Sequence, residues 1–170
     1  TAQLAMIPRS QYLQNIQRHY RRIWGDFDEL RWAKGPPAHV RELPPAFGIL
    51  RFPTSQRRSL LTYATCGMSL VDDAERVECF MFAPFAEDDT LCELLTVTAW
   101  YHRTGARLGC SHTLNFGRPW LPRSHCDYGL LSLPYLDGPY LEWLDADGMR
   151  TQFLWLIPIT SQERDFKATH

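Results

Sequence analysis

Between residues 140 and 166 the apolar positions predict a β-hairpin. Leu141 and Trp143 occupy alternate positions, which indicates a strand with one buried face. Asp147-Gly148 follows where a tight turn needs positive φ, so the chain should reverse there. The return strand, Thr151 to Ile157, is apolar almost throughout. Such a run is typical of a strand covered on both faces, so we expect it in the middle of the sheet with Trp155 nearly fully buried.

The end of this strand and the start of a helix are both marked in the sequence. Pro158 cannot donate to a β-ladder and should close the strand. Thr160 and Glu163 have the spacing of a capping box, in which each side chain bonds to the other residue's backbone N–H. A helix is therefore expected to begin at Thr160.

The remaining elements follow from the same periodicities. Amphipathic helices are predicted over Ser10 to Trp24, and from Glu87 to a stop at Gly105. Strands are predicted at Ala46–Phe52, Ser59–Cys66, Arg76–Phe82, Cys110–Phe116 and Tyr128–Leu133, and a loop-rich passage lies between Gly35-Pro36-Pro37 and Pro44-Pro45. The strands come in neighbouring groups, and one internal helix is long enough for a crossover. The predicted class is α+β, with a mixed, mostly antiparallel sheet of about seven strands and helices packed on it.

Composition narrows the function classes. A chain of 170 residues that is 45% hydrophobic suits one domain, residues 1–170. Its 18 basic and 19 acidic residues give a net charge of −1, which provides no electrostatic reason to expect a nucleic-acid or membrane partner. No apolar run approaches 18 residues and the N-terminus lacks the apolar core of a signal peptide, so we expect a soluble, cytoplasmic protein. The five cysteines are scattered among apolar neighbours, which favours buried free thiols in a reducing compartment.

One group of residues could hold a metal or perform thiol chemistry. Cys110-Ser111-His112, His125-Cys126-Asp127 and His102 contain zinc-ligand types, and Cys126 could be drawn with His112 and Asp127 as a nucleophile system. The Cys-x-His pair would share one face of a strand, but the adjacent His125 and Cys126 would point to opposite faces. We therefore expect no metal, no cofactor and no enzyme. The alternative is a metal- or thiol-dependent enzyme that uses Cys110, His112 and Cys126.

The loop from Gly117 to Asp127 is the candidate binding segment. Trp120 lies between two prolines, with Arg118 and Arg123 alongside. Such a loop could present an aromatic anchor among cations to a protein partner. The competing interpretation is that Trp120 folds back onto the sheet.

Several short stretches resemble, in order and spacing, the Suppressor-of-fused domain family in its compact bacterial form. The most specific parts are the Gly67-Met68-Ser69 segment and the strand that ends in Ile157-Pro158-Ile159-Thr160. The stretches are Tyr63–Ser69, Val77-Glu78, Leu91–Tyr101, His112–Gly117, Leu130–Pro134, Phe153–Thr160 and Glu163-Arg164. The resemblance covers most of Leu60 to Phe166.

This resemblance implies a protein-binding function without a catalytic motif. The animal relatives are cytoplasmic adaptors that sequester transcription factors in a two-domain cleft, whereas this chain has room only for the N-terminal-type domain. Bacterial relatives imply a second form, an immunity protein that binds and neutralises a toxin. The expected function is a non-enzymatic module that occludes a protein partner. A structural domain of a larger assembly is a further alternative.

Overall fold

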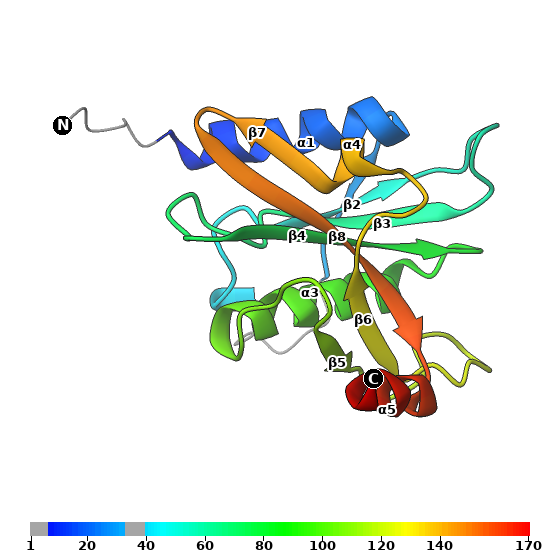
Figure 1. Cartoon of the computed structure of the whole chain (residues 1–170). Helices are drawn as coiled ribbons and strands as arrows, with labels where there is room; N and C mark the ends of the chain where they lie inside the picture. The colour runs from blue at the N-terminus through cyan, green and yellow to red at the C-terminus, as the bar shows by residue number, and fades with distance from the viewer. Residues whose placement is uncertain (1–6, 33–39) are drawn as a thin grey trace.

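A computed structural model describes residues 7–32 and 40–170. Eight of the described strands form one sheet, in the order β1-β2-β3-β4-β8-β6-β5, with β7 beside β8 (Figure 1). The strands are β1 (Asp28–Leu30), β2 (Gly48–Phe52), β3 (Leu61–Cys66), β4 (Arg76–Ala83), β5 (Thr113–Asn115), β6 (Tyr128–Ser132), β7 (Trp143–Ala146) and β8 (Met149–Ile159). Of these described strands, only β4 and β8 pair in parallel. The predicted α+β class with a mostly antiparallel sheet is therefore confirmed.

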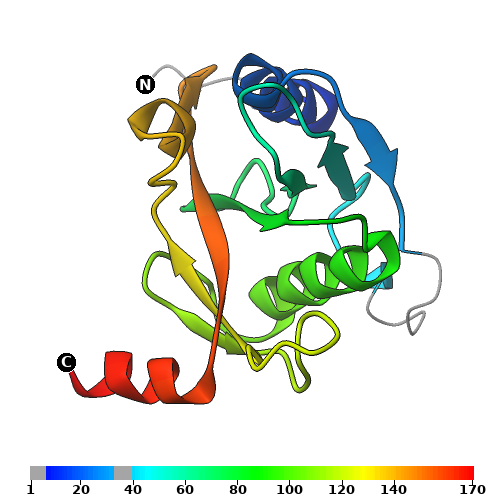
Figure 2. The same ribbon diagram turned by 90° about the vertical axis from the view of Figure 1, so that its right-hand side faces the viewer.

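Helix α1 (Arg9–Trp24) covers one face of the sheet (Figures 1 and 2). Its stripe of Tyr12, Ile16 and Tyr20 is buried against aromatic side chains of the strands. The Tyr20 ring lies 5.1 Å from that of Phe153 on β8, edge to face. Gly25 ends the helix at φ 83, a conformation that glycine adopts without strain. The predicted helix is confirmed within one residue.

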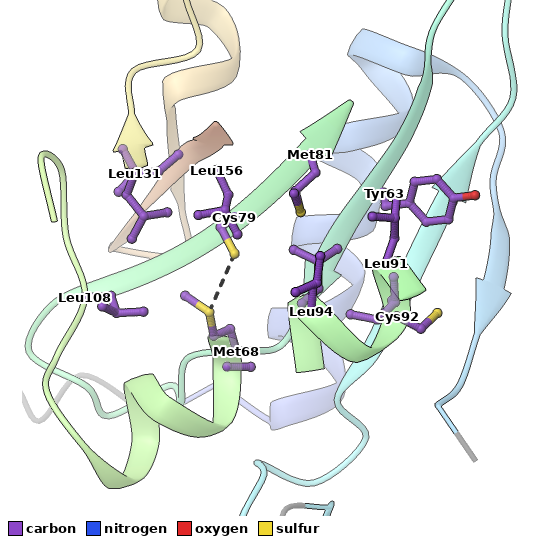
Figure 3. Close-up of a cluster of buried hydrophobic side chains, with 14 of the residues drawn as sticks. Tyr63, Met68, Cys79, Met81, Leu91, Cys92, Leu94, Leu108, Leu131 and Leu156 are labelled. Atoms are coloured by element: carbon purple, nitrogen blue, oxygen red, sulfur yellow. Dashed lines mark hydrogen bonds between the residues drawn. The ribbon is translucent and has the colours of Figure 1, made fainter. Parts of the chain in front are cut away.

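Helix α3 (Asp88–Thr104) covers the opposite face. The second core lies beneath it, and Figure 3 shows its side chains converging from α3, β3, β4, β6 and β8. Cys79 and Met68 meet there with their sulfur atoms 4.0 Å apart. Asp88 in the first turn pairs with Arg51 on β2 and accepts a hydrogen bond of 2.6 Å from the hydroxyl of Tyr63. These contacts fix the start of α3 over the sheet.

Strand β8 lies in the interior of the sheet, as predicted, but two details were wrong. The strand runs through Pro158 to Ile159. Its pairing with β4 ends at Trp155, so Pro158 has a neighbouring strand, β6, on one side only and its missing N–H leaves no gap in a second ladder. Trp155 is half-buried because it lies beyond the rings that cover Phe153, and its own ring contact is with Phe82 at 5.4 Å.

The hairpin before β8 begins later than expected. Residues 139–142 form the one-turn helix α4 (Pro139–Glu142), not a strand, because Pro139 stands at its first position, where a missing N–H costs nothing. The predicted turn is confirmed, with Asp147 at φ 53 and Gly148 at φ 74. The capping box is also confirmed, since Thr160 and Glu163 exchange hydrogen bonds of 3.2 and 2.7 Å at the start of α5 (Ser161–Thr169).

Other boundaries differ by a few residues. Strand β1 was not predicted, and the strand expected at Cys110–Phe116 is reduced to β5. The cysteines are all free, but Cys110 is exposed and Cys126 half-buried, so only three of the five are buried as expected. Gly35-Pro36-Pro37 lies outside the described residues.

Candidate functional site

A groove of about 340 Å³ runs between α3 and β5. Apolar and aromatic side chains form much of its wall, and few charges enter it. Its lining residues are Glu93, Leu94, Val97, Thr98, Trp100, Tyr101, Thr113, Leu114, Asn115, Phe116 and Arg118. Apolar and polar groups share the wall nearly equally, so the groove can receive apolar side chains and hydrogen-bonding groups of a peptide together.

The strand beside this groove is the last one in the described sheet. β5 pairs with β6 on one side, where His112 O accepts from Leu131 N and Phe116 N donates to Asp127 O, both at 2.9 Å. Because antiparallel residues alternate, Thr113 and Asn115 direct their N–H and C=O groups to the other side. Among the described residues no main-chain group bonds to them there. The groove therefore adjoins an edge that can accept another strand.

The loop of residues 117–127 continues from β5 and is closed on itself. Trp120 N donates to Cys126 O at 3.0 Å, and Ser124 N donates to Leu121 O at 3.1 Å. Trp120 is half-buried and packs against the core beneath α3, while Leu121 is buried. Much of the Trp120 indole therefore packs back onto the body of the protein, as the competing interpretation of this loop expected.

The two arginines of this loop have different surroundings. Arg118 lines the groove and donates to the Glu93 carboxylate at 2.6 Å, so its charge is balanced. Arg123 is exposed, with φ 66, at the far turn of the loop. The three predicted binding residues therefore do not form one surface. Arg118 lines the groove, Trp120 packs against the core, and Arg123 lies at the exposed far turn of the loop. Their role in binding stays a prediction.

The alternative cysteine and histidine site is not assembled. Within residues 7–32 and 40–170, no three His, Cys, Asp or Glu side chains are placed to hold a metal ion. Cys110 and His112 flank Ser111 in a turn with φ 73, so the expected strand geometry is wrong. The ring Nδ1 of His112 instead accepts from Gly109 N at 3.1 Å.

Sequence reasoning missed a buried carboxylate on β4. Glu78 is fully buried and accepts from the Thr65 hydroxyl at 2.6 Å and from the N–H groups of Gly67 and Met68 at 3.1 Å each. Burial raises the pKa of Glu78 to about 7, against the lowering effect of these hydrogen bonds and of the Arg9 charge. The sequence feature that could have indicated this buried carboxylate is a single glutamate within the otherwise apolar run Val77–Phe82.

Glu78 and Arg9 together hold the Gly67-Met68-Ser69 segment against α1. The Arg9 guanidinium donates to Gly67 O at 2.7 Å and to Ser69 O at 2.5 Å. Gly67 has φ 91, and a Cβ there would lie 2.5 Å from Arg9 Nη2 and 2.7 Å from Leu13 Cδ2. The segment is therefore a packing junction between α1 and the sheet, which explains why it must contain glycine.

These features define an α+β domain with a mixed sheet between two helices, a buried glutamate junction and an open groove at one sheet edge. Residues 44–170 match the family described as Suppressor of fused protein (SUFU). The chain belongs to this family. No helix in the described part is long and apolar enough to cross a bilayer.

Three solved structures have a similar fold. A SUFU homolog from Neisseria gonorrhoeae FA 1090 is similar with a TM-score of 0.79 and 29% identity, covering 95% of this chain and 84% of that one. The structure of the Sufu-Fu complex matches with a TM-score of 0.68, 13% identity and coverages of 93% and 79%. Drosophila Suppressor of Fused matches with a TM-score of 0.65 and 14% identity, covering 91% of this chain but 43% of its own. A comparison with curated proteins found no match.

Proposed function

We propose that this protein is a non-enzymatic protein-binding module, and that an extended segment of its partner occupies the groove between α3 and β5. The free edge of β5 beside a groove with apolar and polar walls carries this proposal. A strand added to that edge would bond to the main chain of Thr113 and Asn115, and its alternate side chains would enter the groove. Family membership supports the general function, since a Sufu protein forms a complex with Fu.

The groove favours a mostly uncharged segment. Arg118 and Glu93 neutralise each other at its rim, and the exposed ring of Tyr101 offers apolar area with a hydroxyl. A partner's apolar side chains would gain free energy by leaving water, at about 25 cal/mol per Å² of buried surface. The main-chain N–H and C=O groups of the partner segment would form hydrogen bonds with the main chain of β5 and not with side chains.

We further propose that the partner is a toxin and that the module acts as an immunity protein. The resemblance to compact bacterial family members and the Neisseria homolog support this form of the function. Co-expression with the polypeptide encoded by the neighbouring reading frame tests it directly. Rescue of growth from that polypeptide is expected, and toxicity that persists despite a soluble module would overturn the immunity role.

A photo-crosslinking amino acid at position 101 tests the groove. Irradiation in cells should capture one partner, and the same amino acid at position 166, on exposed α5, is the matched control. Binding of the captured protein is then measured by calorimetry. Arg118→Glu places a second carboxylate beside Glu93, so a loss of at least about tenfold in affinity is expected, equivalent to 1.4 kcal/mol. Equal affinity of this variant and of wild type, with unchanged melting, would remove the groove from the interface.

A further inference from the structure

A short segment away from the groove exposes three large apolar side chains. Tyr135, Leu136 and Tyr140 are 68%, 61% and 82% exposed. We refer to these three side chains as the Tyr135 patch. Exposed aromatic and aliphatic groups that gather at one place are typical of protein interfaces, where they act as anchors.

The backbone that carries the Tyr135 patch is held in place. Asp137 N and Gly138 N both donate to the carbonyl of Pro134, at 3.1 and 2.8 Å, and Pro134 is buried. Leu141, one residue beyond the patch, is fully buried, and its carbonyl lies 2.9 Å from His19 Nε2 on α1. These contacts hold the backbone of the patch, so little backbone ordering entropy would be lost when a partner binds.

A recess reaches Asp137, the residue that follows Leu136 of the patch. A cavity of about 230 Å³ is lined there by Trp24, Phe52, Arg57 and Asp137, among others. The Asp137 side chain is only 8% exposed and is paired with Arg58, whose guanidinium also stacks 4.5 Å from the Phe82 ring centre. The recess has a fixed wall and can receive a side chain from whatever covers the patch.

The charged groups around the patch carry an excess of positive charge. Arg57 and Arg22 are exposed, and within the described part of the chain neither is paired with a carboxylate. Arg22 follows His19 by three residues on α1, so it lies on the side of the helix where His19 Nε2 meets the Leu141 carbonyl. Of the nearby acids, Asp137 is paired with Arg58, whereas Glu142 accepts from the neutral Gln152 amide at 3.5 Å and keeps its charge. The two exposed arginines therefore outnumber the one carboxylate that no cation balances among the described residues.

We propose that the Tyr135 patch is a second docking surface, which takes an acidic segment of a partner protein that carries aliphatic or aromatic residues. Apolar side chains of that segment pack on the three exposed groups, and its carboxylates pair with Arg57 and Arg22. Figures 1 and 2 both place α4 at the end of the molecule that carries α1, and β5 and α5 at the other. This surface is therefore separate from the groove and does not depend on the function proposed for it.

The charge pattern distinguishes this occupant from a second copy of the chain. A two-fold contact would place the same patch on both subunits, so the arginines of one copy would approach those of the other. Like charges oppose such a contact, whereas an acidic segment removes the imbalance.

The test uses a display library of random twelve-residue peptides, selected on the intact protein. We expect enriched peptides to combine Asp or Glu with Leu, Phe or Trp. The variant with Tyr135→Ser, Leu136→Ser and Tyr140→Ser should bind them at least about tenfold more weakly, as should Arg57→Glu. Phe166→Ser is the matched control, because it removes an equally exposed ring from α5, and it should bind like wild type. Equal melting temperatures would show that all variants are folded.

Several results would overturn the proposal. Failure to enrich peptides, enrichment of basic peptides, or equal binding by the triple variant would show that the patch does not recognise an acidic segment. If the protein self-associates in sedimentation and the triple variant does not, the patch binds a second copy of the chain. If the protein binds phosphatidylserine vesicles and the triple variant does not, the patch binds a membrane. Peptides that bind the triple variant but no longer bind the Arg118→Glu variant occupy the groove. The two proposals can therefore be refuted independently.

Discussion

Replacing the buried Glu78 by glutamine should change how stability depends on pH. Burial raises the pKa of Glu78 from its ordinary 4.5 to about 7. Between these values the folded protein holds a proton that the unfolded chain has released, so the free energy of unfolding falls as the pH rises. Because one pKa unit corresponds to about 1.36 kcal/mol, we expect a fall of about 2.5 kcal/mol from pH 5 to pH 8 that Glu78→Gln lacks.

Urea unfolding of both proteins at several pH values measures this difference. Glutamine accepts through one oxygen only, so it also costs a hydrogen bond, but that loss does not depend on pH and cancels in the slope. Titration of His19 and of His102, whose pKa burial lowers to about 4, is common to both proteins and cancels as well. Glu75→Gln, at an exposed carboxylate, is the control and should follow wild type. Parallel curves for wild type and Glu78→Gln would show that Glu78 ionises normally in the folded protein.

Substitutions in β8 and in the turn before it, together with thiol labelling, test the burial of single side chains and the turn's backbone. Phe153→Ala should lower the free energy of unfolding by about 3–5 kcal/mol and Trp155→Ala by less, as measured in urea, because only Phe153 is fully buried; equal losses would contradict this. Gly148→Val should cost at least about 1 kcal/mol, because its φ of 74 is unfavourable for a β-branched residue, and an unchanged urea midpoint would mean that the turn tolerates it. A thiol reagent should react quickly with Cys110, more slowly with Cys126, and with all five cysteines only after unfolding; rapid reaction of three or more in the native protein would contradict the burial of the others.

The elements that could be predicted from the sequence are those whose signals are local. The apolar run of β8, the Asp147-Gly148 turn and the Thr160 capping box each depend on residues close in the chain, and all three are present. The start of the hairpin was wrong because the alternation around Leu141 suits one helical turn as well as a strand. The predicted full burial of Trp155 was wrong because the sequence of a strand does not show which aromatic rings will cover each of its side chains.

The sites depend on contacts between distant residues, which the sequence does not reveal. Arg9 and Gly67 are 58 residues apart, so the junction around Glu78 is visible only in the fold. The groove needs α3 beside the free edge of β5, and periodicity predicts each element without their arrangement. The loop of Arg118, Trp120 and Arg123 was a reasonable candidate, but positive φ at Arg123 and the packing of Trp120 separate its side chains.

Amide hydrogen exchange of Thr113 and Asn115 tests the central claim most directly. These two N–H groups lie on the free edge of β5, so they should exchange quickly in the protein alone. With the captured partner bound, a strand added to β5 would accept from both groups, and we expect their exchange to slow by at least about tenfold. Protection of other segments while these two amides exchange as before would show that the partner binds elsewhere and would contradict the proposed function of the groove.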